Sequence, residues 1–496
     1  MIAVLQRPRE STAKNVTKMR IYAGMRSVIV LAGAALAVAC AAAGTVTFTE
    51  ETGVFRNPGQ GWSTMGGKWS FDKTDPVVNV GSVYCRYAWS QLEPEEGRYN
   101  WKPLEDLFDF AASKGLPASF RVMCASRHDN TGWTTPPWVF KKGAKDDPFL
   151  ASGTVRGKET NIVHHTPIFD DPVFMDAHRR FIKALAARYD GDPRLAGLDL
   201  GSYGHWGEWH CGGLPPNTNL YVAAEVRAKL KRMPPREYPF EIRKQYADWY
   251  LEGFKNTPIV FMTGDWEVLK YALGTEPTAR VGLRRDGVGS PWHFKRWIGT
   301  KPYDAIPRMG DVWKDRPVWF EFYGDAQSIL EKKWDLPYAI EWMLTNHVTV
   351  VNTCPFSPWQ LKDDPVHYPL LRKIDLYAGV RLVPLTANVR REGNRLSVEL
   401  SGVNKGVARI HLPYVAQIVV TDAAGSELMV HEAAVDPGSW LPGPFRLVDA
   451  FDLPPESQDG LKLALRLRHR YGFFRNFRFA ARETLPDGSL PLGPVR

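Results

Sequence analysis

The sequence predicts an α/β fold, a (β/α)8 (TIM) barrel followed by a C-terminal β-sandwich domain. Between Gly53 and Asn352, eight strand-like runs alternate with helical segments, as in a barrel of parallel strands. After about Val380 only short strand-like runs follow, separated by Gly, Asp, Asn and Pro. The chain of 496 residues is also longer than one ordinary domain. We therefore expect the barrel at residues 44–379 and the accessory β-sandwich at residues 380–496.

The elements are assigned from apolar runs of strand length and from helical spacing. The expected barrel strands cover residues 53–57, 82–89, 117–123, 195–200, 258–263, 280–283, 317–322 and 348–352. The expected helices cover residues 103–114, 172–188, 221–233, 240–254, 325–330 and 338–346. Residues 124–171 are rich in Gly, Pro, His and Trp, which predicts a long loop. In the C-terminal domain the expected strands cover residues 395–400, 408–412, 417–421, 427–430 and 461–467.

Residues 1–43 have the features of an export signal peptide. Arg20 and Arg26 precede an apolar run from Val28 to Ala43 that ends in small residues. The run is short for a stable membrane span, and no later stretch is as long, so we expect no transmembrane span in the mature chain. We expect an exported protein that is periplasmic, anchored at the outer membrane or extracellular.

Five cysteines occur in the chain. The segment Ala37-Val38-Ala39-Cys40 resembles a lipoprotein box, although that pattern prefers Leu at the position of Ala37, so a lipid anchor at Cys40 stays open. The other four are widely spaced and form no C-x-x-C pair, which predicts free buried thiols and leaves two disulfides as the alternative: Cys85, Cys124, Cys211 and Cys354.

Charge and composition indicate carbohydrate as the partner. The formal charge is +9, but residues 1–43 contribute about half of it, and the rest of the chain has no run of Lys and Arg. We therefore expect no nucleic acid partner. The aromatic content is 12%, with 18 Trp, and flat aromatic faces suit the apolar faces of sugar rings.

The stretch from Leu195 to His210, LAGLDLGSYGHWGEWH, passes from a strand into a segment rich in Gly and aromatic residues. It places Glu208 between Trp206 and Trp209. A carboxyl group held against indole rings loses hydration, which raises its pKa toward the range of a general acid. The alternative is a surface glutamate in a loop whose tryptophans belong to the core.

A second glutamate, Glu321, ends the seventh expected strand, while Glu208 follows the fourth. In a (β/α)8 barrel both belong on the face formed by the C-terminal ends of the strands. Two carboxylates suffice for glycoside hydrolysis, because one protonates the leaving oxygen and the other attacks the anomeric carbon or activates water. We expect the two carboxyls to converge, at about 5 to 5.5 Å in a retaining enzyme.

Other polar and aromatic residues are candidates for substrate binding. Arg86 and Arg121, inside the second and third strands, either hold the nucleophile ionised or pair with structural acids. Asp265 and Asp286, past the fifth and sixth strands, either bind sugar hydroxyls or cap helices. The remaining candidates lie in or beside loops: Trp133, His205, Trp206, Trp209 and Trp292. No carboxylate or Cys recurs at ligand spacing around the pair His164 and His165, so we expect no metal and no other cofactor.

Tyr87 to Trp101, YAWSQLEPEEGRYNW, is similar to the W-x-x-x-E-P-x-x-G-x-Y-x-W segment of family 42-like galactosidases in glycoside hydrolase clan A. The resemblance covers the barrel and implies a retaining enzyme with Glu208 as acid/base and Glu321 as nucleophile. Clan members have Asn directly before the acid/base, where this chain has Gly207.

Nearly the whole mature chain also resembles exported bacterial proteins of an uncharacterised domain-of-unknown-function family. The shared features are an NPxxG motif, a GxWGEWH signature and a C-terminal β-module that ends as DGSLPLG does here. We expect an exported, retaining glycoside hydrolase. The alternatives are a non-catalytic carbohydrate-binding barrel protein of the cell envelope, which Gly207 favours, and a structural envelope protein.

Overall fold

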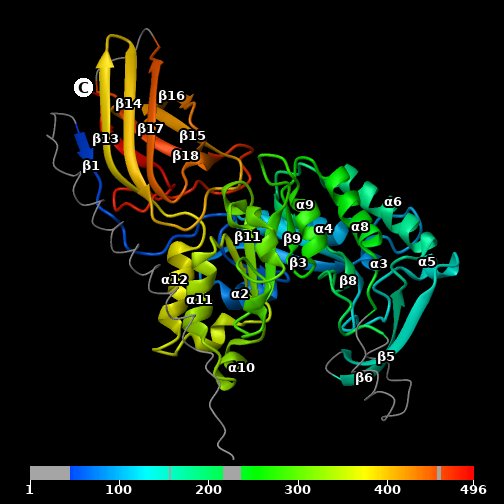
Figure 1. Cartoon of the computed structure of the whole chain (residues 1–496). Helices are drawn as coiled ribbons and strands as arrows, with labels where there is room; N and C mark the ends of the chain where they lie inside the picture. The colour runs from blue at the N-terminus through cyan, green and yellow to red at the C-terminus, as the bar shows by residue number, and fades with distance from the viewer. Residues whose placement is uncertain (1–44, 156–157, 216–235, 455–459, 496) are drawn as a thin grey trace, which may run out of the picture. The chain divides into compact units, whose positions relative to one another are not determined.

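The computed structural model describes residues 45–155, 158–215, 236–454 and 460–495. Its centre is a closed ring of eight parallel strands in chain order, in which each strand pairs with the next and the last pairs with the first (Figure 1). The strands are β2 (Gly61–Met65), β3 (Val80–Ala88), β4 (Ala118–Ala125), β7 (Leu195–Asp199), β9 (Ile259–Met262), β10 (Gly282–Val288), β11 (Val318–Phe322) and β12 (Val350–Asn352). The predicted (β/α)8 barrel is confirmed.

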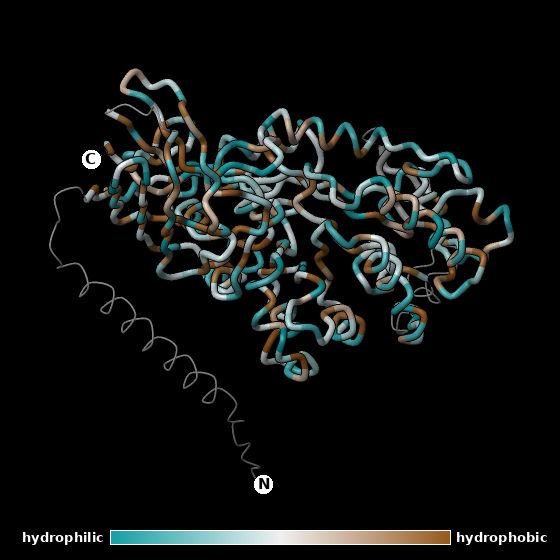
Figure 2. The backbone as a smooth tube through the Cα atoms, turned by 90° about the horizontal axis from the view of Figure 1, so that it is seen from above, coloured by the Kyte–Doolittle hydropathy of each residue, from teal (hydrophilic) through white to brown (hydrophobic). Residues whose placement is uncertain are grey.

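Helices surround this ring. The α-helices are α2 (Lys68–Thr74), α3 (Trp89–Leu92), α4 (Lys102–Ser113), α5 (Pro137–Lys141), α6 (Pro172–Tyr189), α8 (Phe240–Gly253), α9 (Trp266–Leu273), α10 (Ala326–Glu331), α11 (Leu336–Thr345) and α12 (Tyr368–Tyr377). Short 3-10 turns are η1 (His293–Lys295), η2 (Tyr303–Ala305), η3 (Pro307–Gly310), η4 (Val312–Lys314) and η5 (Pro358–Leu361). Hydrophilic and hydrophobic residues alternate along the helices in Figure 2, as in helices that bury one face. The helix expected at residues 221–233 lies outside the described residues.

The first barrel strand differs from the prediction. Residues 53–57 form no strand, and β2 occupies Gly61–Met65 instead. Its Ser63 and Thr64 side chains are buried in the barrel, so the strand has no apolar run that a hydrophobicity pattern would detect.

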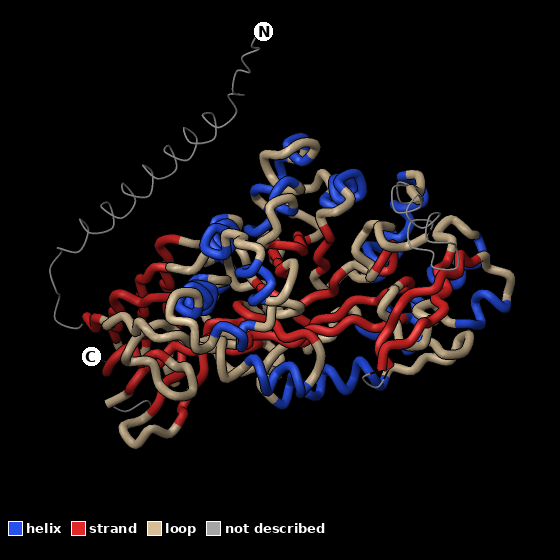
Figure 3. The backbone as a smooth tube through the Cα atoms, turned by 90° about the horizontal axis from the view of Figure 1, so that it is seen from below, coloured by secondary structure: helices blue, strands red, loops and turns tan. Residues whose placement is uncertain are grey.

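The predicted loop at residues 124–171 is also wrong in part. It contains α5 and an antiparallel hairpin of β5 (Asp146–Val155) and β6 (Lys158–Pro167), in which Asp146 pairs with Pro167. The hairpin appears in red apart from the barrel strands in Figure 3. Gly, Pro and His in this stretch mark turns in the sequence, but they do not prevent pairing along the strands between them.

The C-terminal part is rich in β-structure, as predicted. One four-stranded sheet has the order β1 (Thr45–Thr47), β13 (Leu382–Glu392), β14 (Arg395–Asn404) and β17 (Gly443–Asp452). The other has the order β16 (Glu427–Glu432), β15 (Tyr414–Thr421), β18 (Lys462–His469) and β19 (Leu490–Pro494), and η6 (Pro437–Ser439) precedes β17. The strand expected at residues 408–412 is absent, because Ala408, Ile410 and Leu412 are buried in the core without ladder partners. The domain limits at residues 379 and 380 stay a prediction.

Among the described helices, none combines the length and the apolar character needed to cross a membrane.

Candidate active site

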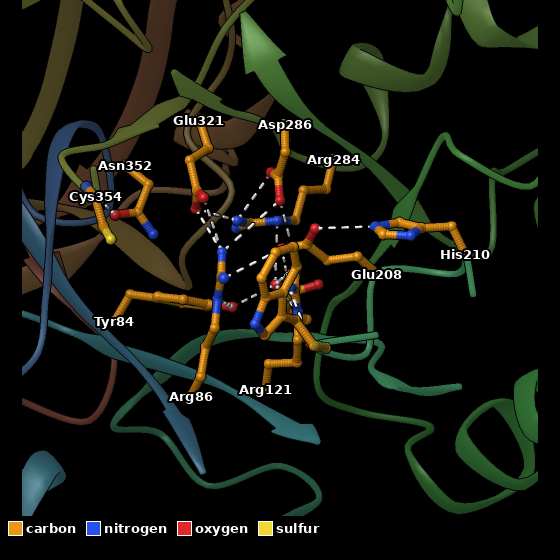
Figure 4. Close-up of polar contacts among 12 residues, drawn as sticks. Tyr84, Arg86, Arg121, Glu208, His210, Arg284, Asp286, Glu321, Asn352 and Cys354 are labelled. Atoms are coloured by element: carbon orange, nitrogen blue, oxygen red, sulfur yellow. Dashed lines mark hydrogen bonds and ion pairs between the residues drawn. The ribbon is translucent and has the colours of Figure 1, made fainter. Parts of the chain in front are cut away.

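Three carboxyl groups meet at the C-terminal ends of the barrel strands (Figure 4). Glu321 lies on β11, Asp286 lies on β10, and Glu208 lies in the segment that follows β7. Each offers one oxygen atom, and these atoms all lie within 4.8 Å of one another. The predicted convergence of Glu208 and Glu321 is confirmed, and Asp286 joins them.

Glu321 is held by two arginines, one from the adjacent strand β10 and one from β3, which lies farther around the ring. Nη2 of Arg86, on β3, donates to Oε1 and Oε2 of Glu321 at 2.9 and 2.7 Å. Nη2 of Arg284, on β10, donates to Oε2 at 2.5 Å. Because Glu321 is 6% exposed, these two cations replace water in balancing its charge.

Glu208 reaches the site through a detour of the chain. After β7 ends at Asp199, the chain turns and pairs again as β8 (Ser202–His205), which runs parallel to β4. The detour explains why Glu208 stands eight residues beyond Leu200 and still faces the barrel. Its backbone is unusual, because the non-glycine residues Ser202, Trp206 and Trp209 have positive φ angles of 69°, 57° and 59°. Such conformations cluster at functional sites.

Gly207 suits this backbone. Its φ is +70°, and a Cβ there would lie 3.0 Å from Gly201 Cα, Ser202 N and Val122 O. Asn tolerates the left-handed region better than most residues, but its Cβ would press on these backbone atoms, which would have to give by a few tenths of an ångström. The detour therefore favours Gly over the Asn of the clan pattern.

The surroundings of Glu208 hold it as an anion. Its Oε1 lies 3.1 Å from Nη1 of Arg86 and accepts from Nη1 of Arg121 at 3.1 Å, and its Oε2 lies 3.5 Å from Nε2 of His210. Burial raises the pKa of Glu208, but the hydrogen bond with His210 and the charges of Arg86 and Arg121 outweigh it and hold the pKa well below its usual range. The sequence-based expectation of a raised pKa is wrong for this arrangement, because that reasoning had no partner for the carboxylate.

Asp199 is a fourth, buried carboxyl group that pairs with arginines of the site. Its Oδ2 accepts from Tyr84 Oη at 2.6 Å and from Arg121 Nε at 2.8 Å, and Arg284 Nε lies 3.3 Å away. Asp199 and Arg121 are fully buried. Arg121 therefore pairs with a structural acid, as the second interpretation expected, and it also reaches Glu208, the expected acid/base.

Asp286 has the weakest contacts of the cluster. Its Oδ1 lies 2.9 Å from Nη2 of Arg284, and its Oδ2 lies 3.8 Å from Arg86 and 3.9 Å from Arg121. Burial, together with the charges of Glu321 and Glu208, raises the pKa of Asp286 to about 8, against the opposing effect of Arg284 and Arg121. Asp286 caps no described helix, and its carboxyl lies in the site.

Trp206 lies beside the carboxyl cluster, between two histidine rings. His205 stacks on it at 3.6 Å between ring centroids, and His128 stacks at 5.5 Å. His205 itself is buried, with Nδ1 3.0 Å from the Gly212 carbonyl. The structure thus gives His205 a supporting position, whereas Trp206, two residues before Glu208 in the chain, is partly exposed.

The other aromatic candidates lie elsewhere. Trp209 is a core residue, 3% exposed, whose indole nitrogen donates to the Leu200 carbonyl, so the expected sugar contact is wrong for Trp209. Trp133 stacks on His165 of the hairpin at 3.7 Å. Trp292 is 54% exposed and packs edge-on against Trp334.

Asp265 follows the helix-capping interpretation. Its side chain accepts from the Val268 backbone N–H at the start of α9 and forms an ion pair with Arg243. These partners leave it in a structural position at the end of β9.

The spacing of Glu208, Asp286 and Glu321 is also that of a metal site. However, Arg86 and Arg284 already place guanidinium nitrogens between the carboxyls. A cation would have to displace these arginines, so the residues present fit a network of ion pairs better than a metal site.

Comparisons with known proteins agree with the barrel. The sequence model of glycoside hydrolase family 42, described as beta-galactosidase, matches residues 76–206. The chain is similar to beta-galactosidase BgaA from Thermus sp., at 29% identity over 27% of this chain and 19% of that protein. It is also similar to beta-galactosidase BgaB from Geobacillus sp., at 22% identity over 55% of this chain and 41% of that protein. The chain thus spans less than half the length of these relatives.

Among solved structures, endo-glycoceramidase II from Rhodococcus sp. matches with a TM-score of 0.38 and 10% identity, over 82% of this chain and 100% of that one. The resemblance to an uncharacterised exported family stays a prediction. The chain is therefore a (β/α)8-barrel protein in which residues 76–206 match the family 42 sequence model.

Proposed function

We propose that the protein is an exported, retaining glycoside hydrolase with Glu321 as nucleophile and Glu208 as acid/base. The observation that carries the proposal is the approach of the carboxyl oxygens to within 4.8 Å at the C-terminal ends of the strands. Retaining enzymes have carboxyls about 5 to 5.5 Å apart, whereas inverting enzymes need about 6.5 to 9.5 Å to admit a water molecule. Because the matched relatives are beta-galactosidases, β-galactosides are the first substrates to test.

In this mechanism Glu321 attacks the anomeric carbon while a proton passes to the glycosidic oxygen. Arg86 and Arg284 aim the carboxylate of Glu321 into the site. Glu208 then accepts a proton from water, and the resulting hydroxide releases the sugar from Glu321 with retained configuration.

One observation favours a second function, that of a carbohydrate-binding barrel without catalysis. Two arginines hold Glu208 as an anion, whereas an acid/base must begin the reaction protonated. Export and a lipid anchor at Cys40 rest on residues 1–43, which lie outside the described residues.

The test compares Glu321→Ala with Glu208→Ala, and Glu331→Ala at the exposed end of α10 is the matched control. Glu321→Ala should lose hydrolysis of every substrate by several orders of magnitude, and azide should then yield a glycosyl azide of inverted configuration. Glu208→Ala should still react with a dinitrophenyl glycoside, and azide should give a product of retained configuration. Full activity in both variants contradicts the assignment. A wild type that binds sugars but cleaves no glycoside supports the second function.

A further inference from the structure

Strand β10 contains one residue more than its neighbour at the level of the site. Arg285 pairs with Phe320 on β11 and Val288 pairs with Phe322, so Asp286 and Gly287 together stand opposite Glu321. Such a bulge re-aims a side chain and is common beside active sites. Gly287 permits it, because its φ is +81° and a Cβ would collide with the His293 ring. The bulge therefore places a third carboxyl, which a double displacement does not need, beside the other two.

The charges of the described cluster do not balance if every carboxyl is ionised. Four carboxyl groups, those of Asp199, Glu208, Asp286 and Glu321, face three guanidinium groups, those of Arg86, Arg121 and Arg284. An unpaired charge in a buried site is costly, and carboxylates that share a site keep a proton between them. His210 also lies 3.5 Å from Glu208, and while its ring is neutral one carboxyl proton balances the cluster.

Asp286 is the group best placed to hold that proton. Glu208, Glu321 and Asp199 each accept at least one hydrogen bond from a guanidinium group, whereas both buried oxygens of Asp286 lack a hydrogen-bond partner of good geometry among the described residues. The charged groups that act on it are Arg284 and Arg285 from β10, Glu321 from β11, Glu208 from the detour, and Arg86 and Arg121 from β3 and β4. The Cys354 thiol, past β12, also interacts with it. The raised pKa, about 8, agrees with this assignment.

We propose that Asp286 stores the catalytic proton in the resting enzyme and delivers it through Glu208. The proposal rests on the proposed function and adds a third carboxyl to its mechanism. The oxygens of Asp286 and Glu208 lie within 4.8 Å of each other, so a proton needs at most one bridging water molecule to pass between them.

The proton balance is complete in both steps. In the first, the Asp286 O–H proton moves to the bridging water, which gives one of its protons to Glu208. Glu208 passes that proton to the glycosidic oxygen as the C–O bond breaks and Glu321 bonds to the anomeric carbon. In the second, the attacking water gives a proton to Glu208 and its oxygen replaces Glu321 at the anomeric carbon. The proton then returns through the bridging water to Asp286.

The first test needs no substrate. The infrared spectrum of the resting wild type should contain the carbonyl stretch of a protonated carboxylic acid at neutral pH, and this band should disappear with a midpoint of about pH 8. Isotope-labelled aspartate should move the band and labelled glutamate should not. Asp375, whose pKa burial raises to about 6, loses its own band at lower pH. Asp286→Asn should lack the band, and Asp325→Asn, at the N-cap of α10, should keep it.

The infrared test distinguishes failure of the proton-storage proposal from failure of the proposed function. The expected band does not depend on whether the protein cleaves a glycoside. The absence of a titrating aspartic acid band above neutral pH overturns the proposal, and so does a band that persists in Asp286→Asn. Glu321→Gln offers a second check, because removing the neighbouring charge should lower the midpoint of the band. An unchanged midpoint contradicts the proposal.

The second test is kinetic. Asp286→Asn should lower kcat/KM at least about 100-fold for alkyl glycosides, whose leaving groups need a proton, and much less for dinitrophenyl glycosides. The alkaline limb of the wild-type pH profile should move in Asp286→Asn and stay in place in Asp325→Asn. Equal losses on both substrates with an unmoved limb would assign Asp286 a structural role and overturn the proposal.

Discussion

A single guanidinium group connects the two proposed catalytic glutamates. Nη2 of Arg86 donates to both oxygens of Glu321, and Nη1 lies 3.1 Å from Glu208. The two carboxylates therefore cannot move independently in the resting site. A substrate that enters between them must separate at least one from Arg86.

Arg86→Lys should show what this bridge contributes. Lysine keeps the charge but has no planar fork, so it cannot serve both carboxylates at once. The loss of charge-assisted hydrogen bonds worth about 1.5 to 3 kcal/mol each should lower kcat/KM by about 10²-fold or more. Steady-state kinetics measures the change, and Arg179→Lys on the exposed side of α6 is the control. Activity equal to wild type would show that the bridge is dispensable.

Asp286→Asn should change the pH dependence of stability. The native pKa of about 8 lies above the unfolded value of about 3.9, so between these values the native state binds more protons than the unfolded state. The free energy of unfolding of the wild type loses this contribution as pH rises through about 8. The stability of Asp286→Asn relative to wild type should therefore grow as pH rises from about 5 to about 9.

Chemical denaturation at several pH values measures this difference. Asp325→Asn is the control, because hydrogen bonds from Ser328 lower the pKa of Asp325, and its difference from wild type should be constant above pH 5 or so. A constant difference for Asp286→Asn as well would mean that Asp286 is already ionised at neutral pH.

Gly207→Ala should destabilise the protein and impair the site. The left-handed backbone costs an alanine roughly 1 to 2 kcal/mol, and the contacts at 3.0 Å add crowding. Gly66→Ala is a matched control, because Gly66 also has a positive φ, +86°, but its Cβ would meet nothing within 4 Å. Denaturation should show the larger loss for Gly207→Ala, and only this variant should lose activity. Equal losses of stability in the two variants would show that crowding around the Gly207 Cβ has no effect.

The four described cysteines should titrate as thiols. Cys85, Cys124, Cys211 and Cys354 are free, as predicted, although Cys85 and Cys124 lie on the adjacent strands β3 and β4. Titration of the unfolded, unreduced protein should count all four. In the native protein, burial raises the pKa of Cys354 to about 12, so alkylation should be slow at neutral pH and faster in alkali. A mass that corresponds to a Cys85–Cys124 disulfide would refute the assignment.

Elements that bury apolar side chains could be predicted from the sequence. Helix α4 buries Leu104, Leu107, Phe108 and Ala111, and it was expected at nearly the observed limits. Strand β10 was expected to end at Leu283, but it continues through Arg284 and Arg285 to Val288. Arg284 is buried because Asp199 and Glu321 of other strands pair with it, and Arg285 because it donates to the His293 carbonyl of η1. A local pattern contains no information about such partners.

The same limit applies to the site. Glu208, Glu321, Arg86 and Arg121 could be placed together from strand order alone, because strand ends meet at one face. The ionised state of Glu208 could not be predicted, because it depends on His210 and two arginines. The position of Asp286 beside the glutamates could not be predicted either, because it depends on a bulge in β10.

The detour that presents Glu208 has a consequence for protein engineering. Its hydrogen bonds close within the segment, from His205 N to His210 O and from Trp209 N to Tyr203 O, while Trp206 N binds it to Ala125 O of β4. Its left-handed positions accept few side chains, so saturation libraries at single sites there should yield mostly damaged variants. Residues 201–210 are therefore better replaced together as one segment. Any replacement must still pair with β4, as Trp206 N does with Ala125 O.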